Sequence, residues 1–396
     1  MSKYSLRCFS CLVLVLVVGS IACDSSTVVA RRTASRARRQ GANTPPSPSE
    51  LTDTARLLAG LQPDPTGPLA AVAAKPEWTA WRSEVDAHWT RLSTGHFDKM
   101  AQWRDRELAP LTGNCGTLMY PFSGPDILNA LVLFPDCKRF ILFGLEPVGS
   151  LPSLDALPPE RLARLLDETR KALNDLLERN YFITSHMMQE TAAQELRGTL
   201  PLIALSLVRL DARLVGVREM EIAEDGTLRP RTPPVKDRRV ASAIEIRFER
   251  PDHDPQSLVY FRAQAEDRAL PNRPGVMPFL ERQAPFLTFL KSASYLLHTS
   301  DFTLMRAMLL EHSRLVLEDD SGIPLRYLKA PDWRVNFYGR YTTPVKDFNY
   351  GYQADMAKVY AVPNAVKPLA FSFGYHWRDG FTSVLLAVRH SASSTN

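Results

Sequence analysis

Hydrophobic residues recur with helical spacing mainly in the first half of the chain. Trp78, Trp81, Val85, Trp89 and Leu92 lie three or four residues apart, which predicts an amphipathic helix whose aromatic stripe packs into the core. A second helix follows Pro158-Pro159, with one apolar face: Leu162, Leu165, Leu166, Leu173, Leu176 and Leu177. Shorter helical patterns cover residues 184–195 and 200–213. A longer one runs from Pro278 to Leu297, and Pro285 is expected to kink or divide it.

Strand patterns dominate the second half. Ile244, Ile246 and Phe248 alternate with charged residues, which predicts a half-buried strand, and residues 258–261 are its expected hairpin partner. Further strands are expected over residues 140–145, 213–222, 315–317, 333–337, 371–375 and 384–388. Helices come early and strands late, without regular alternation. The pattern therefore predicts an α+β fold, with a helix-rich N-terminal half packed on a mainly antiparallel sheet from the C-terminal half.

The first 22 residues have a different pattern. Lys3 and Arg7 precede an unbroken apolar run over residues 12–18, and Ser20-Ile21-Ala22 follows with small residues. This order is typical of a secretory signal peptide. The apolar or small stretch is too short for a transmembrane helix, which needs about 20 residues.

The end of this segment resembles the lipobox of bacterial lipoproteins. Ile21-Ala22-Cys23 matches it, and the resemblance implies that Cys23 is lipidated and becomes the first residue of the mature protein. Ser20 departs from the pattern, which usually has leucine there, and Ser20-x-Ala22 also satisfies ordinary signal cleavage. The expected product is a membrane-anchored lipoprotein facing the periplasm or cell surface, with a soluble secreted protein as the alternative.

Residues 23–74 are rich in proline and small polar residues, and five arginines lie between residues 31 and 39. Such a composition predicts a flexible tether, although a short helix is expected near Ser49, with Glu50 and Asp53 in its first turn. The expected organisation is a signal peptide (1–22), a tether (23–74) and one globular α+β domain (75–396).

Composition and charge exclude several classes of protein. The formal charge of +5 falls to +3 when Lys3 and Arg7 are removed with the signal, which is too small a surplus to indicate a nucleic-acid partner. The sequence has no G-x-S-x-G, G-x-x-x-x-G-K, G-x-G-x-x-G or H-E-x-x-H motif, and no cofactor is expected.

The number of cysteines is consistent with export. Apart from those in the signal and Cys23, the chain contains Cys115 and Cys137, an even pair for which a disulfide is the preferred interpretation. Two free thiols are the alternative. No second Cys or His lies nearby at ligand spacing, so no metal site is expected.

Two acidic segments are candidates for chemistry. Asp126 ends the heptapeptide Tyr120–Asp126, and Asp319 and Asp320 lie in the segment 318–324, where Gly and Pro impose a turn after a strand. The carboxylates of this turn are candidates for a general base or for calcium ligands, although an EF-hand spacing is missing. The preferred interpretation is a turn that exposes its charges to water. Both segments resemble segments of uncharacterised exported bacterial proteins, a resemblance that implies no particular chemistry.

The sequence therefore predicts a lipid-anchored envelope protein that binds a partner protein or a small ligand. The alternatives are an exported hydrolase that uses Asp126, Asp319 or Asp320, and a purely structural envelope component. A hydrolase is expected to gather these aspartates, with His376 as a further member, around one cleft.

Overall fold

The computed structural model describes residues 46–155, 157–179, 195–231, 239–377 and 380–390. Within it, residues 47–396 form one compact unit. The predicted signal peptide, Cys23 and the helical pattern at 184–194 lie outside the described residues. Among the helices that are described, none combines the length and the apolar character needed to cross a bilayer.

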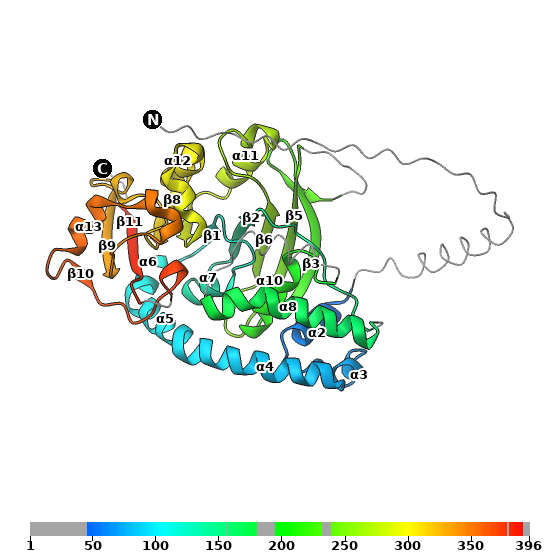
Figure 1. The fold of residues 1–396 in the computed structure, drawn as a ribbon. Helices are drawn as coiled ribbons and strands as arrows, with labels where there is room; N and C mark the ends of the chain where they lie inside the picture. Colours follow the sequence, from blue (N-terminus) through cyan, green and yellow to red (C-terminus); the bar gives the residue numbers. More distant parts are fainter. Residues whose placement is uncertain (1–45, 156, 180–194, 232–238, 378–379, 391–396) are drawn as a thin grey trace, which may run out of the picture. The chain divides into compact units, whose positions relative to one another are not determined.

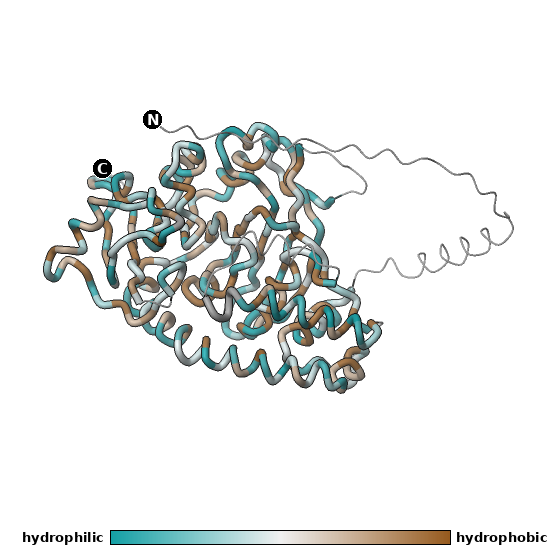
Figure 2. The backbone as a smooth tube through the Cα atoms, viewed as in Figure 1, coloured by the Kyte–Doolittle hydropathy of each residue, from teal (hydrophilic) through white to brown (hydrophobic). Residues whose placement is uncertain are grey.

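Helices occupy much of the first half of the chain (Figure 1). The α-helices of the first part are α2 (Pro48–Leu58), α3 (Ala70–Ala73), α4 (Pro76–Leu92), α5 (Asp98–Trp103), α6 (Ala109–Thr112), α7 (Leu128–Leu133), α8 (Pro159–Arg179) and α10 (Leu200–Arg209). Three short α-helices follow in the second part: α11 (Val276–Glu281), α12 (Thr303–His312) and α13 (Ala354–Tyr360). Along α4, hydrophobic and hydrophilic residues alternate at the helical period, as Figure 2 shows. Its tryptophans Trp78 and Trp81 are buried, as the spacing predicts.

One mixed sheet contains every strand of the described residues. The strands are β1 (Thr117–Tyr120), β2 (Arg139–Gly144), β3 (Arg213–Ile222), β4 (Leu228–Pro230), β5 (Ala241–Glu249), β6 (Gln256–Arg262), β7 (Phe286–Leu290), β8 (Ser313–Glu318), β9 (Trp333–Gly339), β10 (Val366–Lys367) and β11 (Ser383–Arg389). Their order is β10-β9-β11-β8-β7-β1-β2-β6-β5-β3-β4.

The longest ladders, β3 with β5 and β9 with β11, are antiparallel, and β5 and β6 form the predicted antiparallel pair. The five strands in the middle, β8-β7-β1-β2-β6, are parallel. Helices lie mainly in the N-terminal part and strands mainly in the C-terminal part, which confirms the predicted α+β class.

The sheet has a hydrophobic core on each face. Along β2, Phe140 and Leu142 point into one core with the helices α2, α4, α8 and α10, whereas Ile141 and Phe143 point into the other with α11 and α12. This alternation follows from the two-residue period of a strand.

The folded unit begins at Ser47, and not at residue 75 as the proline content predicts. Ser47 caps α2 through a reciprocal capping box with Glu50. Leu57 and Leu58 are fully buried, and their carbonyl oxygens accept hydrogen bonds from the indoles of Trp78 and Trp81. The C-terminal part of the predicted tether is therefore a component of the core.

Two predicted elements of the second half are wrong. The helix predicted from Pro278 to Leu297 is instead α11, the central strand β7 and a 3₁₀ segment over Ala293–His298. All five residues of β7 are buried because helices cover both faces, so their apolar run does not show the alternation of a half-exposed strand. Residues 371–375 form no strand, and a 3₁₀ turn covers Gly374–His376.

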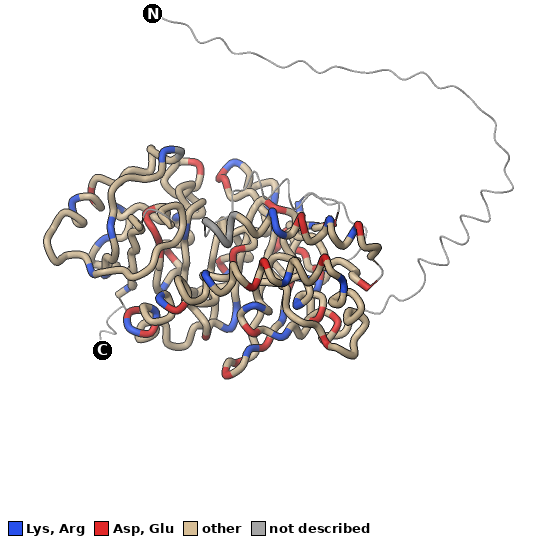
Figure 3. Tube along the Cα trace, turned by 60° about the horizontal axis from the view of Figure 1, so that its bottom comes forward, with Lys and Arg blue, Asp and Glu red and all other residues tan. Residues whose placement is uncertain are grey.

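Charged residues of both signs are interspersed over the described chain (Figure 3). Their ion pairs lie mostly at the surface, where each contributes at most about 1 kcal/mol. The pair between Lys291 and Asp126 is different because the side chains are 1% and 3% exposed. This buried pair marks the part of the molecule described next.

Candidate functional site

The polar cluster of the protein lies at the carboxyl ends of three neighbouring parallel strands. Asp126 follows β1, Lys291 follows β7, and Asp319 and Asp320 follow β8. From β1 the chain continues to β2 on one side, whereas β7 and β8 lie on the other side, so the strand order reverses between β1 and β7. In open sheets with parallel strands, ligands bind outside the carboxyl ends at such a reversal.

Asp126 is held by three side chains. Tyr120 Oη donates a hydrogen bond to its Oδ2 over 2.9 Å, and Asn129 Nδ2 donates to Oδ1 over 3.4 Å. Lys291 Nζ lies 2.5 Å from Oδ2. Burial, followed by the nearby charge of Asp126, raises the pKa of Tyr120 well above its ordinary value, so the phenol stays protonated and donates.

Asp319 lies beside this pair. Its Oδ2 accepts the backbone N–H of Ser292 over 3.2 Å, and its Oδ1 accepts the backbone N–H of Ser321 over 3.0 Å and that residue's hydroxyl. Burial raises the pKa of Asp319, whereas these hydrogen bonds and the charge of Lys291 oppose the rise. Through Lys291, the segments after β1, β7 and β8 form one electrostatic unit.

Asp320 is the carboxyl group best suited to transfer a proton at neutral pH. Tyr295 Oη donates to its Oδ2, and Gln353 Nε2 donates to its backbone oxygen over 3.1 Å. Burial and then the charge of Asp319 raise its pKa to about 7, while the charge of His376 opposes the rise. An acid or base with a pKa near the working pH is the most effective in general catalysis.

The three sequence candidates Asp126, Asp319 and Asp320 are thus brought together, and His376 lies within electrostatic reach. The preferred interpretation of residues 318–324 as a water-exposed turn is wrong, because Asp319 and Asp320 are each only 4% exposed. Glu318, the last residue of β8, is also buried and accepts the backbone N–H of Ile323 over 2.7 Å. The turn folds inward because Gly322 packs against this side chain.

Ser292 belongs to the same site and was not singled out from the sequence. Its φ of 62° is in the left-handed region, which side chains other than glycine rarely adopt. Its hydroxyl is buried and forms no hydrogen bond with any described residue, and Gly374 lies against it and against Asp319. Strained backbone of this kind concentrates at functional sites. The incorrect helix prediction over residues 278–297 left Lys291 and Ser292 unrecognised, because a helical pattern, even one divided at Pro285, places no strand end there.

A pocket lies next to the cluster. Ala293 and Leu296, from the 3₁₀ segment after Ser292, form part of its wall, and Phe122, from the loop that leads to Asp126, forms another part. The pocket has a volume of about 70 Å³. None of its lining residues belongs to the cluster itself, whose carboxylates are almost completely covered.

The predicted disulfide and the polar residues of the loop between β5 and β6 lie away from the cluster. Cys115 and Cys137 form a disulfide bond with a Cα–Cα distance of 4.5 Å, which joins the N-terminal ends of β1 and β2. The ring of His253 bonds to Asp136, and Asp254 pairs with Lys138, both at the opposite ends of the strands from the cluster. Within the described ranges, no group of three or more His, Cys, Asp or Glu side chains has an arrangement that could hold a metal ion.

Comparisons with known proteins assign no family. No protein-family model matches the chain, and no curated protein matches it significantly. Its function therefore has to be inferred from the site.

Proposed function

We propose that the protein is an exported hydrolase, anchored to a membrane through Cys23, whose catalytic groups lie at the carboxyl ends of β1, β7 and β8. One observation carries the proposal: Asp126 and Asp319 lie at the buried amine of Lys291, and the buried carboxyl group of Asp320 lies close to that of Asp319. Three carboxyl groups and one amine need a structural or chemical reason to share an interior site, because burying charged groups costs several kcal/mol per ion. Catalysis supplies such a reason.

The geometry supports a division of roles. Asp320, with a pKa near neutrality, takes a proton from the attacking group and returns it to the leaving group. Lys291, held by Asp126, provides positive charge for an oxygen that becomes negative in the transition state. Because Asp126 and Asp319 already lie at this single amine, with Asp320 close to Asp319, an anionic substrate such as a phosphate ester is disfavoured. The favoured substrates are neutral or cationic.

Export and anchoring rest on the sequence. The charged, apolar and small segments of residues 1–22 and the lipobox-like Ile21-Ala22-Cys23 support them. The disulfide between Cys115 and Cys137 supports them as well, since such bonds persist mainly in oxidising compartments outside the cytosol.

The hydrolase is tested by assaying the mature protein against neutral chromogenic esters, anilides and glycosides. We expect turnover of one class, and a loss of kcat of at least about 100-fold in Asp320→Asn, consistent with removal of a general acid or base. Asp254→Asn is the matched control, since Asp254 pairs with Lys138 at the surface. Absence of turnover with every class, or full activity in both Asp319→Asn and Asp320→Asn, contradicts the proposal.

A second candidate is ligand binding without turnover, as expected of an envelope binding protein. It is favoured because the pocket beside the cluster is open whereas the carboxylates are buried. A ligand that binds the pocket and is recovered unchanged, with no substrate hydrolysed, would make this the better description.

A further inference from the structure

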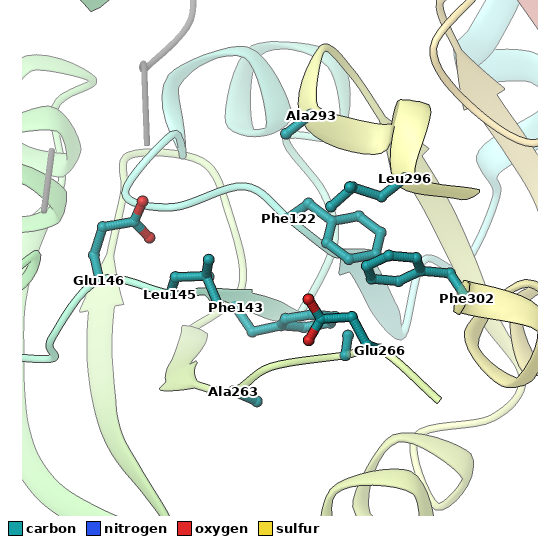
Figure 4. A pocket seen from close by; sticks show the side chains of 11 residues that line it. Phe122, Phe143, Leu145, Glu146, Ala263, Glu266, Ala293, Leu296 and Phe302 are labelled. Carbon is teal, nitrogen blue, oxygen red and sulfur yellow. The ribbon is translucent and has the colours of Figure 1, made fainter. Parts of the chain in front are cut away.

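The pocket beside the cluster has an aromatic wall. Figure 4 shows the rings of Phe122 and Phe302 next to each other, with Phe143 close to them. The Phe122 ring centroid lies 5.5 Å from that of Phe143 and 5.7 Å from that of Phe302, both in edge-to-face arrangements. Leu145, Leu296, Ala263, Ala265 and Ala293 complete the apolar lining.

Phe122 is held in an unfavourable backbone conformation to take this position. Its φ is 59°, and for a bulky residue this left-handed conformation costs on the order of 1–2 kcal/mol. The residue is only half-buried, so the strain is not explained by the burial of its ring in the core. Instead, the strained residue supplies a ring to an open pocket.

Two carboxylates share the pocket with these rings. Glu146 is 3% exposed, and Tyr260 Oη donates to its backbone oxygen over 3.1 Å and to its Oε2 over 3.3 Å. Gly144 and Gly124 leave room for its carboxylate, which lies against both. Burial raises the pKa of Glu146, although the charge of Arg262 opposes the rise. No cation is paired with Glu146 among the described residues.

Glu266 also lines the pocket, and Figure 4 labels it among the lining side chains. It is half-buried, and within the described part of the chain its carboxylate makes no hydrogen bond or ion pair. The lining therefore combines two negative groups with the negative faces of aromatic rings. Such a site attracts an organic cation, because the positive charge interacts favourably with the carboxylates and with the faces of the aromatic rings.

The volume limits the size of the occupant. An apolar cavity of about 150 Å³ holds benzene, so the 70 Å³ of this open pocket encloses roughly three heavy atoms, and the remaining atoms of a slightly larger group lie at its mouth. We propose that the pocket binds a small alkylammonium group, with Phe122, Phe143 and Phe302 around its alkyl part and with Glu146 and Glu266 balancing its charge. The pocket shares no residue with the Asp126–Lys291 cluster, so this binding site does not depend on the hydrolase.

The binding site is tested by isothermal titration of the mature protein with tetramethylammonium chloride, with sodium chloride at the same ionic strength as the salt control. The neutral isostere tert-butanol separates charge recognition from apolar filling. We expect saturable binding of tetramethylammonium and at least about tenfold weaker binding of tert-butanol, which corresponds to 1.4 kcal/mol.

Two variants connect this binding to the pocket. Glu266→Gln keeps the size of a half-exposed side chain and is expected to weaken tetramethylammonium binding at least about fivefold, as removal of one close charge predicts. Phe302→Leu keeps an apolar side chain and removes one ring, with a similar loss expected from the cation–π contribution. Asp254→Asn, at the surface beside Lys138, is the control and leaves binding unchanged.

Three results would overturn the proposal. They are the absence of saturable binding, equal binding of tert-butanol and tetramethylammonium, and unchanged binding in Glu266→Gln. The hydrolase is assayed separately with Asp320→Asn. A failure of either proposal is thus recognised without reference to the other.

Discussion

Lys291 Nζ lies 2.5 Å from Asp126 Oδ2, although the two residues are far apart in the sequence and both side chains are almost fully buried. The contact joins the carboxyl end of β7 to that of β1 at the point where the strand order reverses. Asp319, after β8, is within reach of the same amine. The chain thus places a cation among carboxylates at the carboxyl ends of the parallel strands, which is where open sheets of this kind bind ligands.

Breaking this ion pair from either side is expected to be strongly destabilising. Lys291→Met leaves Asp126 buried without its cation, and Asp126→Asn leaves the amine without its counter-charge. Each is expected to lower the free energy of unfolding by about 3–5 kcal/mol, and the double variant by less than the sum. Urea denaturation of the wild type, the two single variants and the double variant measures this coupling. Additive losses would show that the pair is not coupled in the folded state.

The stability that Asp320 contributes is expected to fall as the pH rises. Its pKa is about 7 in the folded protein and about 3.8 in an unfolded chain, so the folded state binds more protons between about pH 4 and pH 7. Relative to Asp320→Asn, the wild type is expected to lose on the order of 4 kcal/mol across this window, at about 1.4 kcal/mol per pKa unit, and to lose nothing further above it.

The measurement is urea unfolding of both proteins between about pH 4 and pH 8, because the difference between them cancels the titration of other groups. Buried His96 and His298, whose pKa values burial lowers, titrate with the opposite sign and are present in both proteins. A difference in stability that is constant over this range contradicts the assignment of a raised pKa to Asp320.

Ser292 and Ser321 are expected to respond oppositely to replacement by alanine. The Ser292 hydroxyl is buried and unbonded within the described chain, so Ser292→Ala is expected to stabilise the protein by about 1 kcal/mol. The Ser321 hydroxyl donates to the Asp319 carboxylate, so Ser321→Ala is expected to destabilise it by about 1.5–3 kcal/mol.

Ser292→Gly also removes the strain of a φ of 62° and is expected to be at least as stable as Ser292→Ala. Thermal unfolding of the three variants tests this order. Destabilisation by Ser292→Ala would mean that its hydroxyl has a structural partner. If stability rises while hydrolysis falls, Ser292 is retained for function and not for folding.

Removing the disulfide is expected to destabilise the folded unit. Cys115 and Cys137 are 22 residues apart, and in the chain-entropy model closing such a loop contributes about 3 kcal/mol. The double variant Cys115→Ser/Cys137→Ser is compared with wild type by urea denaturation, and reduced wild-type protein serves as the control. Equal stability of oxidised and reduced wild type would show that the bond contributes nothing.

Lipidation is tested by metabolic labelling with a clickable fatty acid. Wild type is expected to carry the label in the membrane fraction, and Cys23→Ser is expected to lose it, because this thiol is the attachment site that the lipobox-like segment predicts. Cys11→Ser, within the signal peptide, is the matched control and is expected to remain labelled. An unlabelled, soluble wild-type protein would indicate ordinary cleavage after Ala22.

The sequence by itself determined the α+β class, the helix at Trp78–Leu92 and the β5–β6 hairpin. The helix has one face in the core and one in water, so its periodicity is visible in the residue pattern, and β5 was recognised from the alternation of Ile244, Ile246 and Phe248 with charged residues. The capping signals near Ser49 marked α2, but the sequence did not show that Trp78 and Trp81 bond to its last turn. Compositional arguments therefore placed the domain start too late.

Only the tertiary structure decided where the chemistry lies. β7 is buried on both faces, so its apolar run has no alternation and was not recognised as a strand. Without that strand, the sequence did not predict that Lys291 and Ser292 lie close to Asp126. Whether Asp319 and Asp320 face water or the interior likewise depends on what packs over the turn, and Gly322, Gly374 and Gln353 come from three separate segments. Aspartates are recognisable in a sequence, whereas their convergence depends on strand order, which long-range packing determines.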